Sequence, residues 1–261
     1  MRREILLIMA VFALMLPGPS CSGKVIDYRP VVLQTYSHDS KAYTQGLFFV
    51  GEQMYETTGE YGRSSLRKVD LETGVVRSKV SFASKYFAEG SCVVGSDLYV
   101  LTWKNKVAFV YDLESLTYRK TLSYPREGWG LASIPEDCLS KFPQGTAMVS
   151  SDGSSSLYFL DGELRTLKTI KVTLDGRPVR LLNELEWIDG KIWANVYTTD
   201  MIVIIDPFSG RVEGKIDCSD LIPYFRRTPA MDVLNGIALG PDSQIYLTGK
   251  NWPKMFRIRL E

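Results

Sequence analysis

The chain has 261 residues, of which 45% are hydrophobic and 23% charged, enough to bury a sizeable core in one large domain or two small ones. Lysine and arginine number 31 against 30 acidic residues, so the formal net charge is +1, and no basic cluster stands out beyond the first residues. This balance argues against a nucleic-acid partner.

The first segment predicts export. Two arginines precede an apolar run over residues 5–16, which has the length of a signal-peptide core and is too short to span a bilayer. We interpret 1–20 as a cleaved signal peptide, 21–30 as a linker and 31–261 as one folded domain. Cleavage by ordinary signal peptidase and lipoprotein processing at Cys21 both fit. We therefore expect a periplasmic or otherwise extracytoplasmic protein, attached to a membrane only through a lipid on Cys21.

The remaining cysteines give weaker guidance, although an exported protein can hold disulfides. Cys92 lies in an apolar strand pattern and is expected to be a buried thiol. Cys138 and Cys218 lie in loop-like contexts, and a disulfide between them is one interpretation.

A repeat runs along the chain and predicts the fold. Each copy opens with a polar residue or tryptophan, then a small or acidic residue and an apolar strand; the opening residues are Gln45, Glu89, Trp129, Asn183 and Asn235. A turn and a second strand with an aromatic residue follow, and then a third strand, which usually ends in aspartate. The third copy breaks this spacing because residues 133–145 are inserted.

A fourth strand closes the first four copies, but the chain ends at Glu261 before the fifth copy can have one. The segment 31–36, VVLQTY, has the character of the missing strand. The sequence therefore predicts an all-β fold, a five-bladed β-propeller closed by the N-terminal strand, which completes the last blade. A pair of β-sandwiches or a different blade count are the alternatives.

The propeller gives the opening residues a common location, because the first strand of every blade lines the central channel. Aromatic residues fall near the same end of the strands: Tyr43, Phe87, Trp103, Trp129 and Trp252. An apolar cleft with a few convergent polar groups is typical of a small-ligand site. The alternative is that the opening residues are polar caps with unrelated solvent contacts.

The chemistry of this site depends on an acid. The chain has one histidine, His38, so a histidine-rich zinc site or a Ser-His-Asp triad is not expected, and we interpret His38 as a surface loop residue. Glu89 is then the candidate for proton transfer. Aromatic neighbours should raise its pKa by desolvation, while Lys250 nearby would oppose that shift.

Several segments, in this order, give the chain a resemblance to a known family: YTQGLFF (43–49), FAEG (87–90), LTWK (101–104), EGWGLA (127–132), SSDGSSSLY (150–158), LNELEWIDGKIWANVY (182–197), LNGIAL (234–239) and TGKNWPKMF (248–256). The chain resembles the plant and bacterial type of glutaminyl cyclase, a five-bladed propeller unrelated to the zinc-dependent animal enzymes. The resemblance implies cyclisation of the N-terminal glutamine of peptides or proteins to pyroglutamate, with release of ammonia and without metal or cofactor. We expect a monomer that binds such peptides.

The resemblance also implies roles for individual residues. Glu89 matches the catalytic acid of the family. The other matches line its pocket: polar Gln45, Asn183 and Lys250, and aromatic Phe87, Trp103 and Trp129, with Asn235 and Trp252 adjoining. Tyr43 and Tyr197 depart from the pattern, since phenylalanine is common at the first position and tryptophan at the second. Both residues keep a ring but add a hydroxyl, which affects substrate preference more than the reaction.

Two rival functions remain at this point. Glu89, Asn183 and Asn235 are also oxygen ligands that could hold Ca²⁺ in a propeller channel, as in metal-dependent lactonases. A propeller that binds peptides without turnover is the other alternative.

Overall fold

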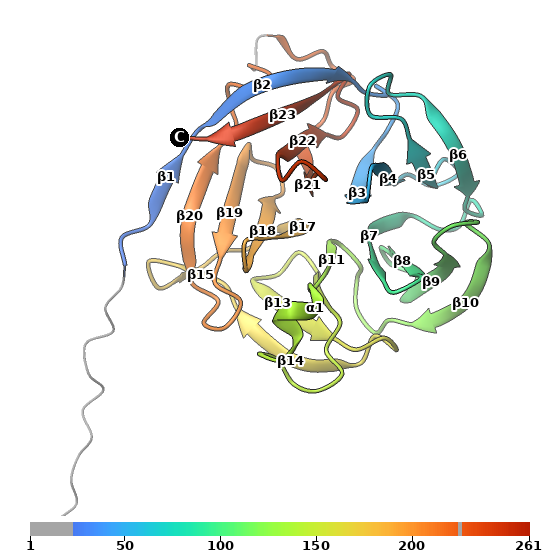
Figure 1. Ribbon diagram of the computed structural model, residues 1–261, viewed down its shortest axis with the longest axis horizontal. Helices are drawn as coiled ribbons and strands as arrows, with labels where there is room; N and C mark the ends of the chain where they lie inside the picture. The colour runs from blue at the N-terminus through green and yellow to red at the C-terminus, as the bar shows by residue number, and fades with distance from the viewer. Residues whose placement is uncertain (1–22, 224–225) are drawn as a thin grey trace, which may run out of the picture.

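The computed structural model describes residues 23–223 and 226–261, which are almost entirely β-strand. Five sheets stand as blades around a central channel (Figure 1), which confirms the predicted five-bladed propeller. The expected signal peptide and Cys21 lie outside the described residues. Within the described ranges, no helix is long and apolar enough to cross a membrane.

Each of the first four blades has four antiparallel strands that follow one another outward from the channel. Blade one consists of β3 (Thr44–Val50), β4 (Gln53–Thr58), β5 (Ser65–Val69) and β6 (Val76–Ser81). Blade two consists of β7 (Ala88–Val94), β8 (Asp97–Thr102), β9 (Val107–Asp112) and β10 (Tyr118–Ser123). Blade three consists of β11 (Leu131–Ser133), β12 (Met148–Ser151), β13 (Ser156–Leu160) and β14 (Thr166–Lys171). Blade four consists of β17 (Leu182–Ile188), β18 (Lys191–Val196), β19 (Met201–Ile205) and β20 (Val212–Asp217).

The N-terminal part of the domain closes the ring. Blade five consists of β21 (Leu234–Leu239), β22 (Ile245–Gly249) and β23 (Lys254–Leu260), and its fourth strand is β2 (Pro30–Ser37), which pairs antiparallel with β23. This confirms the predicted closure. The range expected to be a linker also contains a short strand, β1 (Ile26–Tyr28), which pairs parallel with the outer edge of β20. The N-terminal segment therefore joins blades four and five at their outer edges.

The core lies between blades rather than within one layer. Five clusters of buried apolar side chains each combine residues of two neighbouring blades, and the cluster between blades five and one contains Tyr36, Leu47 and Tyr246. The inner strand β3 is buried over most of its length, whereas the outer strand β6 is largely exposed. Packing face to face around a ring thus buries the inner strands and leaves the outer strand of a blade exposed.

Two connections lie outside the four-strand pattern. A small hairpin, β15 (Thr173–Leu174) with β16 (Arg177–Pro178), links blades three and four. The predicted insertion in blade three contains the short helix α1 (Glu136–Leu139), and Phe142 after it stacks on Phe159 at 4.9 Å between ring centroids. The insertion follows the C-terminal end of β11, so it lies away from the end where the inner strands begin.

The three described cysteines are free thiols, so the disulfide considered between Cys138 and Cys218 is wrong for this structure. Cys138 packs at the edge of the core between blades three and four, whereas Cys218 is buried in the core between blades four and five. One blade separates the two thiols. Cys92 is a buried thiol, as expected.

His38 follows β2 and is buried, so the expectation of a surface residue is wrong. Its Nδ1 lies 2.7 Å from the carbonyl oxygen of Trp252, and its Nε2 lies 3.0 Å from Oε1 of Glu56. Glu56 also accepts a hydrogen bond from the hydroxyl of Thr44 and lies 3.7 Å from the guanidinium of Arg67. Ring closure brings blades five and one together over this loop. The contacts of His38 therefore come from segments that are distant in the chain, which the local sequence does not reveal.

Candidate active site

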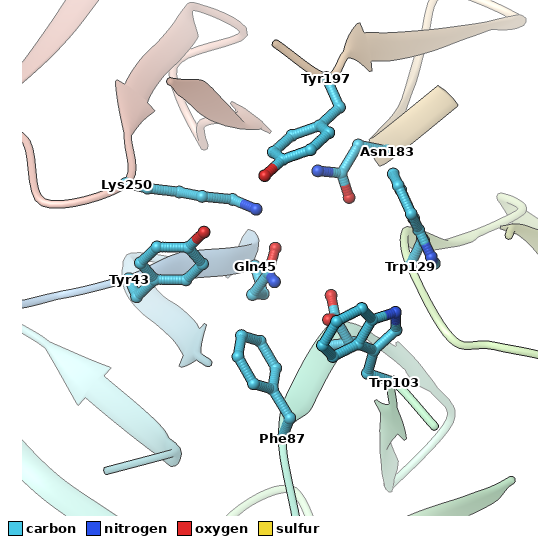
Figure 2. Close-up of a pocket in the computed structure, with 9 residues that line it drawn as sticks. Tyr43, Gln45, Phe87, Trp103, Trp129, Asn183, Tyr197 and Lys250 are labelled. Atoms are coloured by element: carbon cyan, nitrogen blue, oxygen red, sulfur yellow. The ribbon is translucent and has the colours of Figure 1, made fainter. Parts of the chain in front are cut away.

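One cavity opens at the end of the channel where the inner strands begin (Figure 2). Its volume is about 140 Å³, and its walls come from all five blades or the loops that precede them. The lining residues are Tyr43, Gln45, Phe87, Glu89, Trp103, Trp129, Asn183, Tyr197 and Lys250. The structure therefore brings together nine of the eleven residues that the sequence singled out.

The inner strands share an irregularity that directs these side chains. Strands β3, β7, β17 and β21 each break register with their neighbour close to the polar opening residue, between Ala88 and Ser91 in β7 and between Leu182 and Leu185 in β17. An extra residue in one strand bends it and turns the local side chain away from the regular alternation. The bulges explain why Glu89 and Asn183 project into the channel.

A glycine next to Glu89 lets two blades approach closely. A Cβ on Gly90 would lie 2.5 Å from both the backbone nitrogen of Leu131 and the carbonyl oxygen of Trp129. The Gly90 N–H instead donates to that oxygen at 2.6 Å. A side chain at this position would separate blades two and three and displace Glu89 and Trp129 together.

The floor of the cavity is polar and almost fully buried. Gln45, Glu89, Asn183 and Lys250 are each at most 4% exposed. Asn235, one of the two predicted site residues that do not line the cavity, supports this floor by donating from Nδ2 to Oε1 of Gln45 at 3.2 Å. Within the described chain, the Oδ1 atom of Asn183 is buried without a hydrogen-bond partner. An unpaired buried acceptor in a cavity is free to bind a ligand.

Glu89 and Lys250 have pKa values shifted towards their neutral forms. Burial raises the pKa of Glu89 well above its ordinary value, Glu127 adds to the shift by repulsion, and Lys250 opposes it. Burial lowers the pKa of Lys250 to about 8, although the charges of Glu89 and Asp232 oppose that shift. Neither side chain forms a salt bridge with another described residue, so both remain available to a bound molecule.

Aromatic rings form the walls. Phe87 contacts the ring of Trp103 at 5.5 Å and the ring of Tyr43 at 5.9 Å between centroids. The ammonium of Lys250 lies 4.7 Å from the ring centroids of both Tyr43 and Tyr197 (Figure 2). The two tyrosines that depart from the family pattern therefore contact the same cation.

Two acids near the walls were missed by sequence reasoning. Glu127 accepts hydrogen bonds from the indole nitrogens of Trp103 at 2.8 Å and Trp129 at 3.3 Å, which fixes both rings. Its place in the segment EGWGLA, two residues before Trp129, was a usable signal. Asp232 lies within hydrogen-bonding reach of the Tyr43 hydroxyl, and no local pattern marks it.

Trp252 was expected at the site, but the structure places it elsewhere. Its side chain is fully buried in the core between blades four and five. Its indole nitrogen donates to the backbone carbonyl of Asp232 at 2.8 Å, so it supports the segment beside the cavity without lining it.

The chain matches a protein-family model described as glutamine cyclotransferase over residues 6–260. This chain belongs to the glutamine cyclotransferase family. It is 39% identical over 241 residues to a glutaminyl-peptide cyclotransferase of Arabidopsis thaliana, a match that covers 88% of this chain and 71% of the relative. The crystal structure of the Myxococcus xanthus glutaminyl cyclase superposes with a TM-score of 0.81 at 32% identity, covering 91% of this chain and 99% of the other.

Membership of the cyclotransferase family decides between the three functions that the sequence left open. The relative's name is that of an enzyme, which favours turnover over binding alone. The lactonase and the non-catalytic propeller give way to a glutaminyl cyclotransferase because the chain belongs to that family over nearly its whole length.

Proposed function

We propose that this chain converts the N-terminal glutamine of peptides or proteins into pyroglutamate, with Glu89 as the single proton-transfer residue. The observation that carries the proposal is a buried carboxyl, free of hydrogen bonds to described residues, at the floor of an aromatic-walled cavity. Burial raises the pKa of Glu89 well above its ordinary value, which makes its carboxylate a stronger base than that of an exposed glutamate.

The reaction joins two groups of one substrate residue. The α-amine of the glutamine attacks its own side-chain amide carbon, a C–N bond forms and closes the five-membered ring, and the original amide C–N bond breaks to release ammonia. The Glu89 carboxylate takes a proton from the attacking amine. The resulting carboxylic acid then protonates the leaving nitrogen, so one residue serves both steps and is regenerated.

Charge that develops on the amide oxygen needs donors. Lys250 is the first candidate, because at a pKa of about 8 it is mostly protonated at neutral pH and has no salt bridge to a described residue. Gln45 is the second, since its side-chain oxygen is bound by Asn235 and its NH₂ group would then face the substrate. The unpaired Oδ1 of Asn183 would accept a hydrogen from one of the substrate nitrogens.

The aromatic walls would fold the substrate and exclude water. Ring closure competes with hydrolysis of the same amide, and a glutamine bound among Phe87, Trp103 and Trp129 would displace water from the cavity. The same walls hold the α-amine close to the amide carbon, which lowers the entropic cost of closure.

The test measures ammonia release from a glutamine-initiated peptide by the purified domain, with and without EDTA. We expect chelator-resistant release, and Glu89→Gln should lower kcat by roughly 10²–10⁴. Glu184→Gln is the matched control: Glu184 is equally buried and its pKa is also raised by burial, but its carboxylate binds the backbone N–H of Ile237 at 2.9 Å instead of facing the cavity. Near-normal turnover by folded Glu89→Gln, or loss of activity with EDTA, would remove this mechanism.

We also propose that the protein acts outside the cytoplasm as a monomer, anchored by lipid if Cys21 is acylated. The apolar run over residues 5–16 and the cysteine that follows it support this location. Mass spectrometry of the mature N-terminus from native cells tests it. Acylated Cys21 would establish a lipoprotein, an unmodified N-terminus near Cys21 would establish ordinary secretion, and retention of residues 1–20 would contradict export.

A further inference from the structure

A run of aromatic rings leads from the cavity to the surface. Phe87 lines the cavity, and its ring packs edge-on against Tyr61 at 5.4 Å between centroids. Tyr61 is 52% exposed and lies in the loop after β4, at the end of blade one where the cavity opens. An exposed tyrosine in contact with a cavity wall is a favourable surface for an apolar group that leaves the cavity.

Hydrogen bonds tie the loop that carries Tyr61 to itself and to blade two. The carbonyl oxygen of Glu60 accepts the backbone N–H groups of Arg63 at 3.1 Å and Ser64 at 2.9 Å, and the hydroxyl of Ser64 in turn accepts the N–H of Ala88 at 3.0 Å. Glu60 has φ of 82°, a conformation that costs a non-glycine residue free energy. These bonds fix the backbone that carries the exposed ring, and the contact with Phe87 restricts the ring itself, so ordering it on binding costs less entropy than ordering a free side chain.

The size of the cavity decides what reaches this ring. At about 140 Å³ it is well below the roughly 300–1,000 Å³ of pockets that enclose drug-sized ligands. A cavity of this size suits one glutamine side chain with its amine. The second residue of a peptide substrate would then lie outside the cavity, and the contact between Tyr61 and Phe87 offers it an exposed aromatic surface at the mouth.

We propose that Tyr61 and the outer edge of Phe87 form a subsite for the side chain of the second substrate residue, with preference for an aromatic or large apolar group. This inference rests on the proposed cyclisation of N-terminal glutamine. Burying an apolar side chain against the two rings removes exposed surface from water, and an edge-to-face contact adds to that gain.

The test compares kcat/KM for two dipeptide amides, Gln-Phe and Gln-Ala. The intact protein should prefer Gln-Phe by roughly two- to tenfold, the range of one aromatic contact. Tyr61→Ala should abolish the preference, and Tyr61→Phe should keep it. Tyr118→Ala is the matched control, because Tyr118 is 53% exposed on the outer strand β10, far from the cavity, and its loss should leave the preference unchanged.

The outcomes separate this subsite from the reaction itself. Equal kcat/KM values for the two peptides with the intact protein, or a preference that survives in Tyr61→Ala, would overturn the subsite while cyclisation stands. Absence of turnover of both peptides by the intact, folded protein would instead overturn the proposed function. If Tyr61→Ala does not fold, Tyr61→Gln gives the same comparison with a larger polar side chain.

Discussion

Two buried acid–base pairs lie on either side of the segment that carries Gln45: Glu89 with Lys250 in the cavity, and Glu56 with His38 at the ring closure. The pKa of the acid is raised in the first pair and lowered in the second, and the pKa of the base shifts the other way in each. In the cavity, burial raises the pKa of Glu89 and lowers that of Lys250. At the ring closure, burial alone would do the same to His38 and Glu56, but their contact at 3.0 Å outweighs it. The pKa of His38 is therefore raised and that of Glu56 lowered.

The difference lies in hydrogen bonding rather than in burial. Glu56 has His38, Thr44 and Arg67 around it, so its charge is compensated and its proton affinity is low. Glu89 has no such partner among the described residues, and its charge is compensated only at a distance by Lys250. A satisfied pair stabilises the fold, whereas an unsatisfied pair has to complete its bonds with a substrate.

After Glu89→Gln, we expect the largest effect from a substitution that breaks the satisfied pair of Glu56 and His38. Glu56→Gln leaves His38 without its buried counter-charge and leaves Arg67 with Asp39 alone, so the free energy of unfolding should fall by about 3–5 kcal/mol. Chemical denaturation measures this change. Glu72→Gln, at an exposed position, is the control and should alter stability by less than about 0.5 kcal/mol. Equal stability of the two variants would mean that the buried cluster contributes little.

We expect the next largest effect from a substitution that removes Lys250, the cation of the unsatisfied pair. Lys250→Met keeps the length of the side chain but loses an oxyanion donor, so kcat should fall by about 10²–10³. The residual activity should also require higher pH, because loss of the positive charge raises the pKa of Glu89 further. Steady-state kinetics across pH measures both effects. Lys104→Met is the control, since the Lys104 ammonium lies 3.8 Å from the ring centroid of Trp103 and Lys104 does not line the cavity. An unchanged kcat in Lys250→Met would assign the oxyanion to other donors.

A smaller effect is the pH dependence of stability at the ring closure. The native state binds the proton of His38 more tightly than the unfolded state, so this contribution is complete below the ordinary pKa of 6.5. It is lost as pH rises through the higher native pKa, at no more than about 1.4 kcal/mol per pH unit. The charges of Glu56 and Asp39 act on this histidine, and Arg67 lies 3.7 Å from Glu56. Because the pKa of Glu56 is lowered, its own contribution is complete above 4.5 and is lost as pH falls through the native value.

Thermal unfolding at a series of pH values measures this dependence. His38→Gln retains a donor towards Glu56 but cannot titrate, so its alkaline slope should be shallower than that of the intact protein. Identical alkaline slopes in the two proteins would contradict a raised pKa at His38.

We expect the smallest effect from substitutions beside the unsatisfied pair, at residues that influence the pKa of Lys250. Asp232→Asn removes a negative charge that favours protonated Lys250, so the alkaline limb of the kcat profile should move to lower pH. At pH 7, kcat should fall by less than about fivefold. Tyr43→Phe is the companion variant, because it removes the hydroxyl that reaches Asp232 but leaves the charge. A shift in Tyr43→Phe but none in Asp232→Asn would assign the effect to the hydroxyl.

Much of the site could be predicted because it follows the repeat. Gln45, Glu89 and Asn183 stand at equivalent positions of the first, second and fourth copies, and symmetry alone places such residues at one end of the channel. Asn235 obeys the same rule, yet it only supports Gln45. Trp252 was misplaced because a tryptophan next to a site in sequence can turn into the core instead, where its indole finds a backbone acceptor.

The sequence by itself determined the number of blades, the closing strand and the set of polar residues around the channel, because these depend on local strand pattern and its repetition. Tertiary structure alone decided which of those residues are unpaired. His38 finds Glu56 and Trp252 across the ring closure, and Glu127 fixes two indoles from neighbouring segments. The partners of His38, and Glu127 as the partner of Trp103, are distant in the chain, and the pKa of a buried group such as His38 depends on such partners more than on its own sequence neighbours.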